Sequence, residues 1–368
     1  MPRPVRWVLY LVGGALALLL AAAVVVPLVV DVQRFAPAIT EALRGMTGRE
    51  VTLGRIAFRI LPSPAVTVTP VSVKEGPRYP GRDAVRIQSL AVRVRLLPLL
   101  TGRVEFGAIV LDQPTVTLIR DAEGRFNFDD VVSRAQTLSA AAGEKPAAPA
   151  PGAAPPIAIA RAEIRNGKVL VYDDAVIKGK RSELTLAPID AAVSGWGLPG
   201  GARMELSAGL GGSRLAAQGT MAPAGQPAAL SIKVPGSKIQ ATDLTRLFPW
   251  LGVASPRGLA VGGTLLVAGD AEVPLDAAKT VPFHGTIEVE GLSYKDAALA
   301  RPVEKVGGRL AVDGERATWT GFTATIGKST IGGRMQIEDY MAPRIDYDLK
   351  ADRLNLDDLF GTITPSAP

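Results

Sequence analysis

The feature that most constrains the fold is a two-residue alternation of apolar and polar side chains between Thr47 and Val132. Alternation with period two is typical of a β-strand that has one dry face and one wet face. Polar residues such as Arg93 and Thr117 occupy the intervening positions. The sequence therefore predicts a mainly β protein with an elongated, curved antiparallel sheet. The candidate lining of its apolar face is Val66, Val68, Leu90, Val92, Val94, Leu96, Val116 and Leu118.

The alternation changes phase once within the first predicted strand. Val51 and Leu53 share one phase, whereas Ile56 falls in the other, and Gly54 and Arg55 lie between them. A β-bulge, which inserts one extra residue into one strand of a pair, is the simplest explanation for this shift.

An uncharged run from Trp7 to Val30 precedes the predicted sheet and is long enough to cross a membrane as a helix. Arg3 and Arg6 come before the run and favour a cytoplasmic N-terminus. A cleaved signal peptide is the alternative, because Ala21–Ala23 suit a cleavage site, although the apolar run continues beyond them. The residues that represent this anchor are Trp7, Leu11, Leu16, Leu20, Val25 and Val30.

The rest of the chain divides by pattern. A short amphipathic helix is expected from about Phe35 to Thr47, ended by Gly48, where it would cover the first edge of the sheet. The segment 135–156 is rich in Ala and Pro and is expected to be a linker or loop. The expected divisions are 1–31 for the cytoplasmic tip and anchor, 32–134 for an N-terminal helix-plus-sheet domain, 135–156 for the linker, 157–251 and 252–361 for two β-modules, and 362–368 for a tail.

The two β-modules resemble each other. Ile239–Leu247 matches Leu349–Leu359 in pattern, and each segment ends a series of alternating strands. Asp243 and Asn355 are predicted N-caps of short helical turns. We expect the modules to extend the first sheet rather than form separate globules, so that on the order of sixteen to eighteen strands would reach roughly 80 Å.

The residues that carry enzymatic chemistry are sparse. The chain has one histidine, His284, and no cysteine, so we expect no zinc site around it, and a catalytic role for it would require a positioned partner that the sequence does not indicate. The segment 327–330 reads GKST, which matches the end of a phosphate-binding loop. The first glycine of that motif would fall at position 322, but Phe322 occupies it. We therefore expect no catalytic residue, no metal, no cofactor and no enzymatic activity. The net charge of +6 over 368 residues is mild and does not indicate nucleic-acid binding.

Four motifs in order carry a resemblance to a known family. They are TGR at Thr47–Arg49, LLPLLTGR at Leu96–Arg103, LDQP at Leu111–Pro114 and RDAEGRFNFDD at Arg120–Asp130. This series closely resembles the N-terminal region of the AsmA family and covers about a third of the chain. The resemblance implies an envelope protein of Gram-negative bacteria, anchored in the inner membrane with its bulk in the periplasm and related to chorein-type lipid-transfer proteins.

Alternation alone leaves two architectures open, a closed sandwich or barrel and an open trough whose apolar face acyl chains cover. The family resemblance favours the trough, and with it the binding or transfer of phospholipid or another acyl lipid in outer-membrane biogenesis. The alternative function is a non-enzymatic scaffold or regulator of outer-membrane protein assembly and targeting. The partners expected are lipid, the inner membrane, outer-membrane assembly components and a homo-oligomer.

Overall fold

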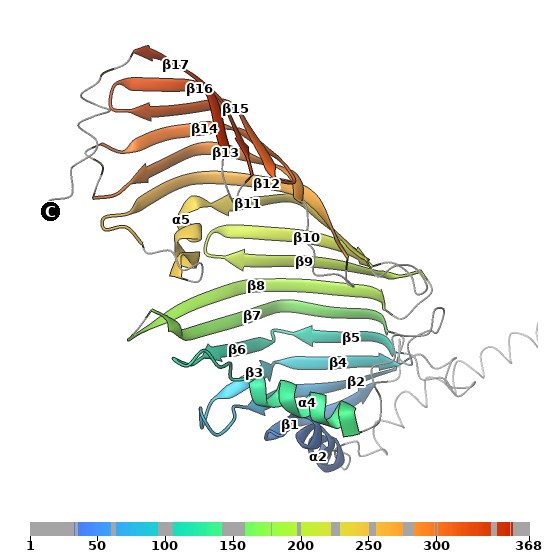
Figure 1. The fold of residues 1–368 in the computed structure, drawn as a ribbon. Helices are drawn as coiled ribbons and strands as arrows, with labels where there is room; N and C mark the ends of the chain where they lie inside the picture. Colours follow the sequence, from blue (N-terminus) through green and yellow to red (C-terminus); the bar gives the residue numbers. More distant parts are fainter. Residues whose placement is uncertain are drawn as a thin grey trace, which may run out of the picture.

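In the computed structural model the strands form one curved 17-stranded sheet (Figure 1). The structure describes residues 33, 36–59, 64–94, 106–141, 159–177, 179–196, 200–221, 229–249, 255–274, 283–297, 299, 301–339, 344–353 and 355. The predicted anchor and 362–368 tail lie outside these residues. Among the described residues, the helices are all too short or too polar to cross a membrane.

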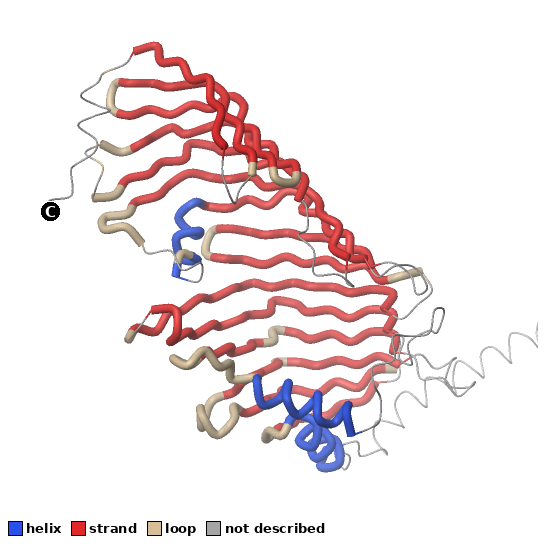
Figure 2. The backbone as a smooth tube through the Cα atoms, viewed as in Figure 1, coloured by secondary structure: helices blue, strands red, loops and turns tan. Residues whose placement is uncertain are grey.

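The strands follow one another along the chain and account for most of the described residues (Figure 2). The first group is β1 Val51–Arg59, β2 Ala65–Lys74, β3 Asp83–Ile87, β4 Ser89–Val94, β5 Phe106–Asp112, β6 Thr115–Arg120, β7 Ile159–Ile177 and β8 Lys180–Trp196. The second group is β9 Ala202–Leu210, β10 Ser213–Met221, β11 Ala229–Gln240, β12 Ala260–Pro274, β13 Phe283–Lys295, β14 Val303–Asp313, β15 Arg316–Ile326, β16 Ser329–Glu338 and β17 Arg344–Arg353.

β3 and β4 both pair with β2, and β5 and β6 both pair with β7, so each of these two pairs shares one row of the sheet. The other strands pair with their neighbours, and the rows follow the order of the chain from β1 to β17. The seventeen strands therefore form fifteen rows, which at about 4.8 Å per row span about 70 Å rather than the predicted 80 Å. The antiparallel prediction is wrong at one junction, because β7 runs parallel to both β5 and β6. A parallel pair needs a long crossover connection, and here the chain between Arg120 and Ile159 supplies it.

Helices gather at the β1 end of the sheet. The predicted amphipathic helix is present as α2, Ala36–Thr47, and the amide of Gly48, with φ of 70°, donates to the carbonyl of Arg44. A second helix, α4, Asp129–Ala141, packs against α2, and Arg134 donates to the carbonyl of Gly45. The first part of the predicted linker is therefore helical rather than a loop, and residues 142–156 lie outside the described residues.

A line of backbone irregularities, here called the crease, divides the strands into two halves. In β1 and β2 the predicted β-bulge at Gly54 and Arg55 is wrong, because the register keeps Leu53 opposite Val71 and Ile56 opposite Val68 with no extra residue. Instead, the alternation of apolar and polar residues shifts by one residue at the same point in both strands. The apolar residues therefore face the same side of the sheet before and after the crease.

The crease continues through the later strands. Asn166 in β7 has a φ of 51°, and the register of β7 with β8 shifts at Gly167. Six successive strands, β11 to β16, each contain one glycine with positive φ. These are Gly236, Gly263, Gly291, Gly308, Gly321 and Gly333. The register shifts at most of these glycines, which is the geometry of a bulge that bends the strand.

The short helix α5, Ala241–Leu244, and the 3-10 turn η2, Thr245–Leu247, follow β11. The predicted N-cap role of Asp243 is wrong, since Gln240 occupies that position. The Asp243 carboxylate instead accepts hydrogen bonds from the Gly212 amide and the Ser213 hydroxyl.

The two predicted modules share one detail. The Ser213 hydroxyl accepts a hydrogen bond from the backbone N–H of Gln240. In the same way, the Ser329 hydroxyl accepts one from the backbone N–H of Asn355. The helical turn predicted after Asn355 lies outside the described residues.

We predict that Gly263→Ala destabilises the sheet by at least about 2 kcal/mol in urea unfolding. Gly263 has a φ of 100°, and an added Cβ would lie 2.5 Å from the backbone of Leu292. Gly200→Ala is the matched control, because a Cβ there meets nothing within 4 Å. Equal effects of the two substitutions would argue against a structural role for the crease.

Candidate functional site

The apolar face of the sheet is built from rows of side chains that lie directly opposite one another on neighbouring strands. Directly opposed residues point to the same face of a sheet. The longest row crosses from β1 to β13. It consists of Phe58, Val66, Val92, Ile109, Ala162, Val193, Met204, Gly219, Ile232, Ala271 and Phe283.

A second row on the same face carries the surface to the last strand. It consists of Val267, Ile287, Leu310, Trp319, Met335 and Tyr347. Beside it, Val289, Val306 and Ala324 form a buried cluster, and Trp319 packs edge-on against Phe322 with ring centroids 5.2 Å apart. The two rows overlap on β12 and β13, so apolar side chains run without interruption from β1 to β17.

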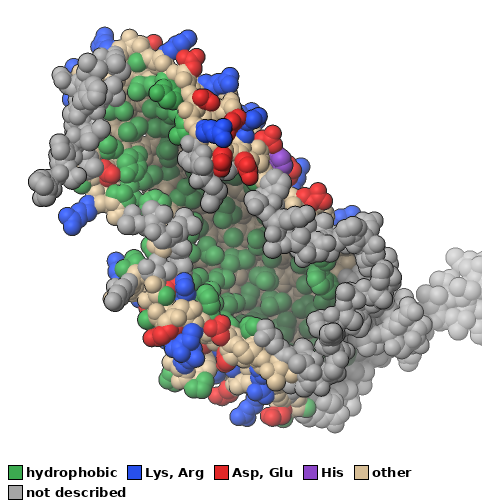
Figure 3. Space-filling view, viewed as in Figure 1, with side chains coloured by type: hydrophobic (Ala, Val, Ile, Leu, Met, Phe, Trp, Pro, Cys, Tyr) green, Lys and Arg blue, Asp and Glu red, His purple; other side chains and the backbone are tan. Residues whose placement is uncertain are grey.

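This apolar face lines a long hollow (Figure 3). Hydrophobic side chains cover its floor, whereas charged side chains gather along its rim. Several of the apolar side chains are strongly exposed, including Leu206 at 47%, Leu215 at 41% and Tyr347 at 71%. An apolar surface this extended is unusual on a monomeric soluble protein and indicates an interaction site.

The structure brings most of the predicted lining residues together. Val66 lies opposite Val92, and Val68 lies opposite Leu90. Across the crease, Val116 lies opposite Val85 of β3 and Val169 of β7, and Leu118 lies opposite Val171. The backbone of Val94 pairs with Phe106, but the Val94 side chain and all of Leu96 lie outside what the structure describes. Whether these residues line a lipid site stays a prediction.

Sequence reasoning missed the greater part of this surface, which lies on β7 to β17. Ile232 belongs to the same row as Val66 and Val92, and Ile287 and Met335 belong to the second row on the same face. The signal was present as the same alternation, for example in the run from Thr286 to Glu290, which reads TIEVE.

The opposite face of the sheet carries polar and charged residues. One row of directly opposed residues crosses from β7 to β17 and alternates in charge over its second half. It consists of Glu163, Ala192, Glu205, Gln218, Lys233, Asp270, His284, Asp313, Arg316, Glu338 and Arg344.

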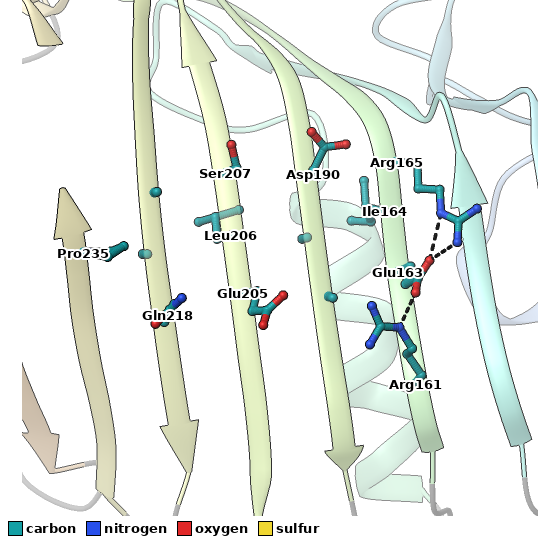
Figure 4. Close-up of a pocket in the computed structure, with 14 residues that line it drawn as sticks. Arg161, Glu163, Ile164, Arg165, Asp190, Glu205, Leu206, Ser207, Gln218 and Pro235 are labelled. Atoms are coloured by element: carbon teal, nitrogen blue, oxygen red, sulfur yellow. Dashed lines mark hydrogen bonds and ion pairs between the residues drawn. The ribbon is translucent and has the colours of Figure 1, made fainter. Parts of the chain in front are cut away.

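A shallow hollow of about 510 Å³ lies on this charged face over β7 to β11 (Figure 4). Glu163 accepts hydrogen bonds from both Arg161 and Arg165, and Glu205 lies on β9, with β8 between them. Because the two arginines are balanced by Glu163, Asp190 and Glu205, the hollow offers little net charge to a ligand.

The described residues offer little catalytic chemistry. His284 Nδ1 lies 2.6 Å from Asp313 Oδ1, but both side chains are largely exposed on the charged face. Among the residues that the structure describes, groups of three or more potential metal-ligating side chains are absent. Gly327 and Lys328 form the β15–β16 turn and Ser329 begins β16 opposite Ile326, so the segment 327–330 is a hairpin rather than a phosphate-binding loop.

Two of the four motifs that carry the family resemblance, TGR and RDAEGRFNFDD, meet at one buried arginine. Arg49, which is 4% exposed, donates to Glu75, to Asp130 and to the carbonyl of Asn127. The Asn127 side chain in turn donates to Glu75 and accepts from the Ile119 amide. This network ties the end of α2, the end of β2 and the start of α4 together, so its role is structural.

The pKa values of the two carboxylates, Glu75 and Asp130, shift in opposite directions. Burial raises the pKa of Glu75, despite the hydrogen bond from Asn127 and the charge of Arg49, which lower it. At Asp130 burial also raises the pKa, but the hydrogen bond and charge of Arg49 outweigh burial, so the pKa is lowered.

We predict that Arg49→Leu lowers the free energy of unfolding by about 3–5 kcal/mol, because it leaves the buried Glu75 carboxylate without its cation. Urea unfolding provides the measurement. Arg181→Leu, which breaks the more exposed pair with Asp174, is the control and should have a small effect. An Arg49 variant as stable as the Arg181 variant would refute the assignment.

A further prediction concerns pH and the variant Glu75→Gln. Folding raises the pKa of the Glu75 carboxyl above its value of 4.5 in the unfolded chain. The carboxyl therefore stabilises the folded protein at a pH below 4.5, and this contribution is lost as the pH rises through the pKa of the folded state. The stability of the wild type relative to Glu75→Gln should therefore increase as pH falls from 7 to about 5. The opposite contribution of Asp130 is lost only below its usual pKa of 3.8, outside this window. Parallel stability curves for the two proteins would show that Glu75 does not titrate there.

Comparison with known proteins agrees with this arrangement. The family model described as the AsmA family matches residues 4–196, which is more than half of the 368 residues. No curated protein matches the chain. The matched segment contains α2, α4, β1 to β8 and therefore the whole Arg49 network. The chain belongs to the AsmA family.

Proposed function

We propose that this AsmA-family protein binds phospholipid or another acyl lipid along the apolar face of its sheet and passes it along the hollow. The observation that carries the proposal is the continuity of the apolar rows from β1 to β17. A bound acyl chain could move from strand to strand without meeting a charged row.

The driving force is the removal of apolar surface from water. Burying each methylene of an acyl chain is worth about 0.8 kcal/mol, and the exposed side chains of the hollow gain in the same way. Because every strand offers a similar surface, lipid would exchange one set of contacts for another of nearly equal energy. Transfer of this kind needs no catalytic residue, and we propose that the protein is not an enzyme.

The apolar run from Trp7 to Val30 would anchor the protein in a bacterial inner membrane, with the sheet in the periplasm. Membership of the AsmA family supports this location. The α2 and α4 end of the sheet follows the anchor in the chain and would therefore lie nearest to that membrane.

We predict that a photoreactive amino acid placed at Val92 or Ile232 in the full chain forms lipid adducts in cells. The matched controls are Arg93 and Lys233, which adjoin those residues but point to the opposite face. Mass spectrometry of the purified adducts gives the readout. Lipid at the apolar positions only is the expected result.

The outcomes separate the two functions that the sequence leaves open. Equal lipid labelling on both faces, or no lipid at any position, would overturn the proposal. Adducts to outer-membrane assembly proteins at Val92 and Ile232 would favour the scaffold function instead.

We further predict that Ile232→Asp combined with Ile287→Asp lowers the amount of co-purifying phospholipid at least about tenfold, because acyl chains would have to desolvate two carboxylates. Thr286→Asp is the control and should retain lipid, since Thr286 adjoins Ile287 but points to the charged face, where its neighbours Ala268 and Ala311 carry no charge. Circular dichroism checks that all variants keep their β structure.

A further inference from the structure

We infer that β17 is a self-association edge through which two copies of this chain pair antiparallel, joining their hollows end to end. The inference stands on the edge strand itself and does not depend on lipid binding. Its basis is the exposure, the pattern and the charges of Arg344–Arg353.

Among the described residues, β17 pairs with β16 and with no other strand, so its second edge presents backbone groups without a partner strand. All ten residues of β17 are exposed, including Ile345 at 55% and Tyr347 at 71%. Proteins usually blunt such an edge with proline, a bulge or charged side chains. From Arg344 to Ala351 this strand has no proline and pairs with β16 in unbroken register, and the register shifts only at Asp352. Its charges, which protect an edge against a partner of like charge, are of both signs.

The alternation in β17 gives each face a distinct role. Ile345, Tyr347, Leu349 and Ala351 continue the apolar face of the hollow, because their partners on β16 are Ile337, Met335, Gly333 and Ile331. The charged face carries Arg344, Asp346, Asp348, Lys350 and Asp352.

The charges select a second copy as the occupant and fix one register. With Asp348 on the two-fold axis, Arg344 lies opposite Asp352 of the other copy and Asp346 lies opposite Lys350, each pair occurring twice, whereas Asp348 faces Asp348 of the other copy once. Centring on Tyr347 would place Arg344 opposite Lys350 and Asp346 opposite Asp348, so every charged pair would be of like sign. Centring on Leu349 would place Asp346 opposite Asp352 and Asp348 opposite Lys350, so like and opposite pairs would balance. Opposite charges stabilise a strand pair and like charges destabilise it, so the first register, with four opposite-charge pairs and one like-charge pair, is favoured.

The symmetry has a direct structural result. A two-fold axis between antiparallel neighbours is perpendicular to the sheet, so both hollows open on the same side. Tyr347 of one copy then lies opposite Leu349 of the other, and the apolar rows continue across the junction. The sheet would double in length.

Cysteine crosslinking tests the register in the full chain, which contains no native cysteine. Opposed residues on antiparallel strands have Cα atoms about 4.5–5.5 Å apart, within the range of a disulfide. Asp348→Cys in membranes should therefore form a disulfide-linked dimer on mild oxidation. Asp346→Cys and Lys350→Cys should each fail alone, because two copies of either residue lie about 13 Å apart, and should crosslink when co-expressed.

A second experiment reverses single charges in the Asp348→Cys variant and measures the yield of the disulfide-linked dimer. Asp346→Lys alone and Lys350→Asp alone should each lower the dimer yield several-fold, because each creates two like-charge pairs. Co-expressing the two variants should restore the yield, since the mixed dimer regains opposite charges. Because all of these side chains are exposed, the substitutions should leave the fold intact.

Three outcomes would overturn the inference. The first is equal crosslinking of cysteines at positions 346, 348 and 350, and the second is the absence of a dimer from Asp348→Cys. The third is a lowered dimer yield that co-expression of the two charge-reversed variants does not restore. A disulfide adduct to a different protein would assign the edge to another partner and would also overturn it. Lipid adducts at Val92 can persist or vanish independently of these results, so the proposed function is tested separately.

Discussion

The whole structure depends on keeping one face apolar in strands that bend in the middle. Successive side chains of a strand point to opposite faces of the sheet. A shift of one residue in the middle of a strand would therefore turn the apolar side chains of its second half to the polar face. Where a strand changes phase at the crease, its apolar positions change phase with it, as between Leu53 and Ile56 in β1 and between Trp319 and Phe322 in β15. The apolar face is therefore one continuous surface that bends along the crease, and the strand halves on either side of the crease form the two walls of the hollow.

The Arg49 network shows how the end of such a sheet is closed. An open sheet leaves the edge of β1 and the end of its apolar face in need of cover, and α2 and α4 supply it. A buried cation shared between Glu75, Asp130 and the Asn127 carbonyl holds these elements in register. Two of the motifs that carry the family resemblance thus stabilise the architecture, whereas the apolar face of the hollow is made largely of common aliphatic residues.

Much of this could be predicted from the sequence, because the alternation is local and strong. The mainly β class, the helix before Val51 and the shared face of Val66, Val68, Leu90 and Val92 follow from periodicity alone. The parallel pairing of β7 could not be predicted, since it depends on where the crossover returns the chain. The role of Asp243 was also missed, because its partners Gly212 and Ser213 are distant in sequence and meet it only through the pairing of β10 with β11. Nor could the joint phase change of β1 and β2 be distinguished from a bulge, as that distinction requires the register between them.

The pairing of each strand with its neighbours has an evolutionary consequence. From β7 onwards the sheet is a string of hairpins, in which stability is nearly a sum of local terms, as in repeat proteins. Gain or loss of one hairpin would change the sheet by about 10 Å and leave the distant strands untouched. The length of such a sheet can therefore change in steps of one hairpin while the rest of the fold is kept.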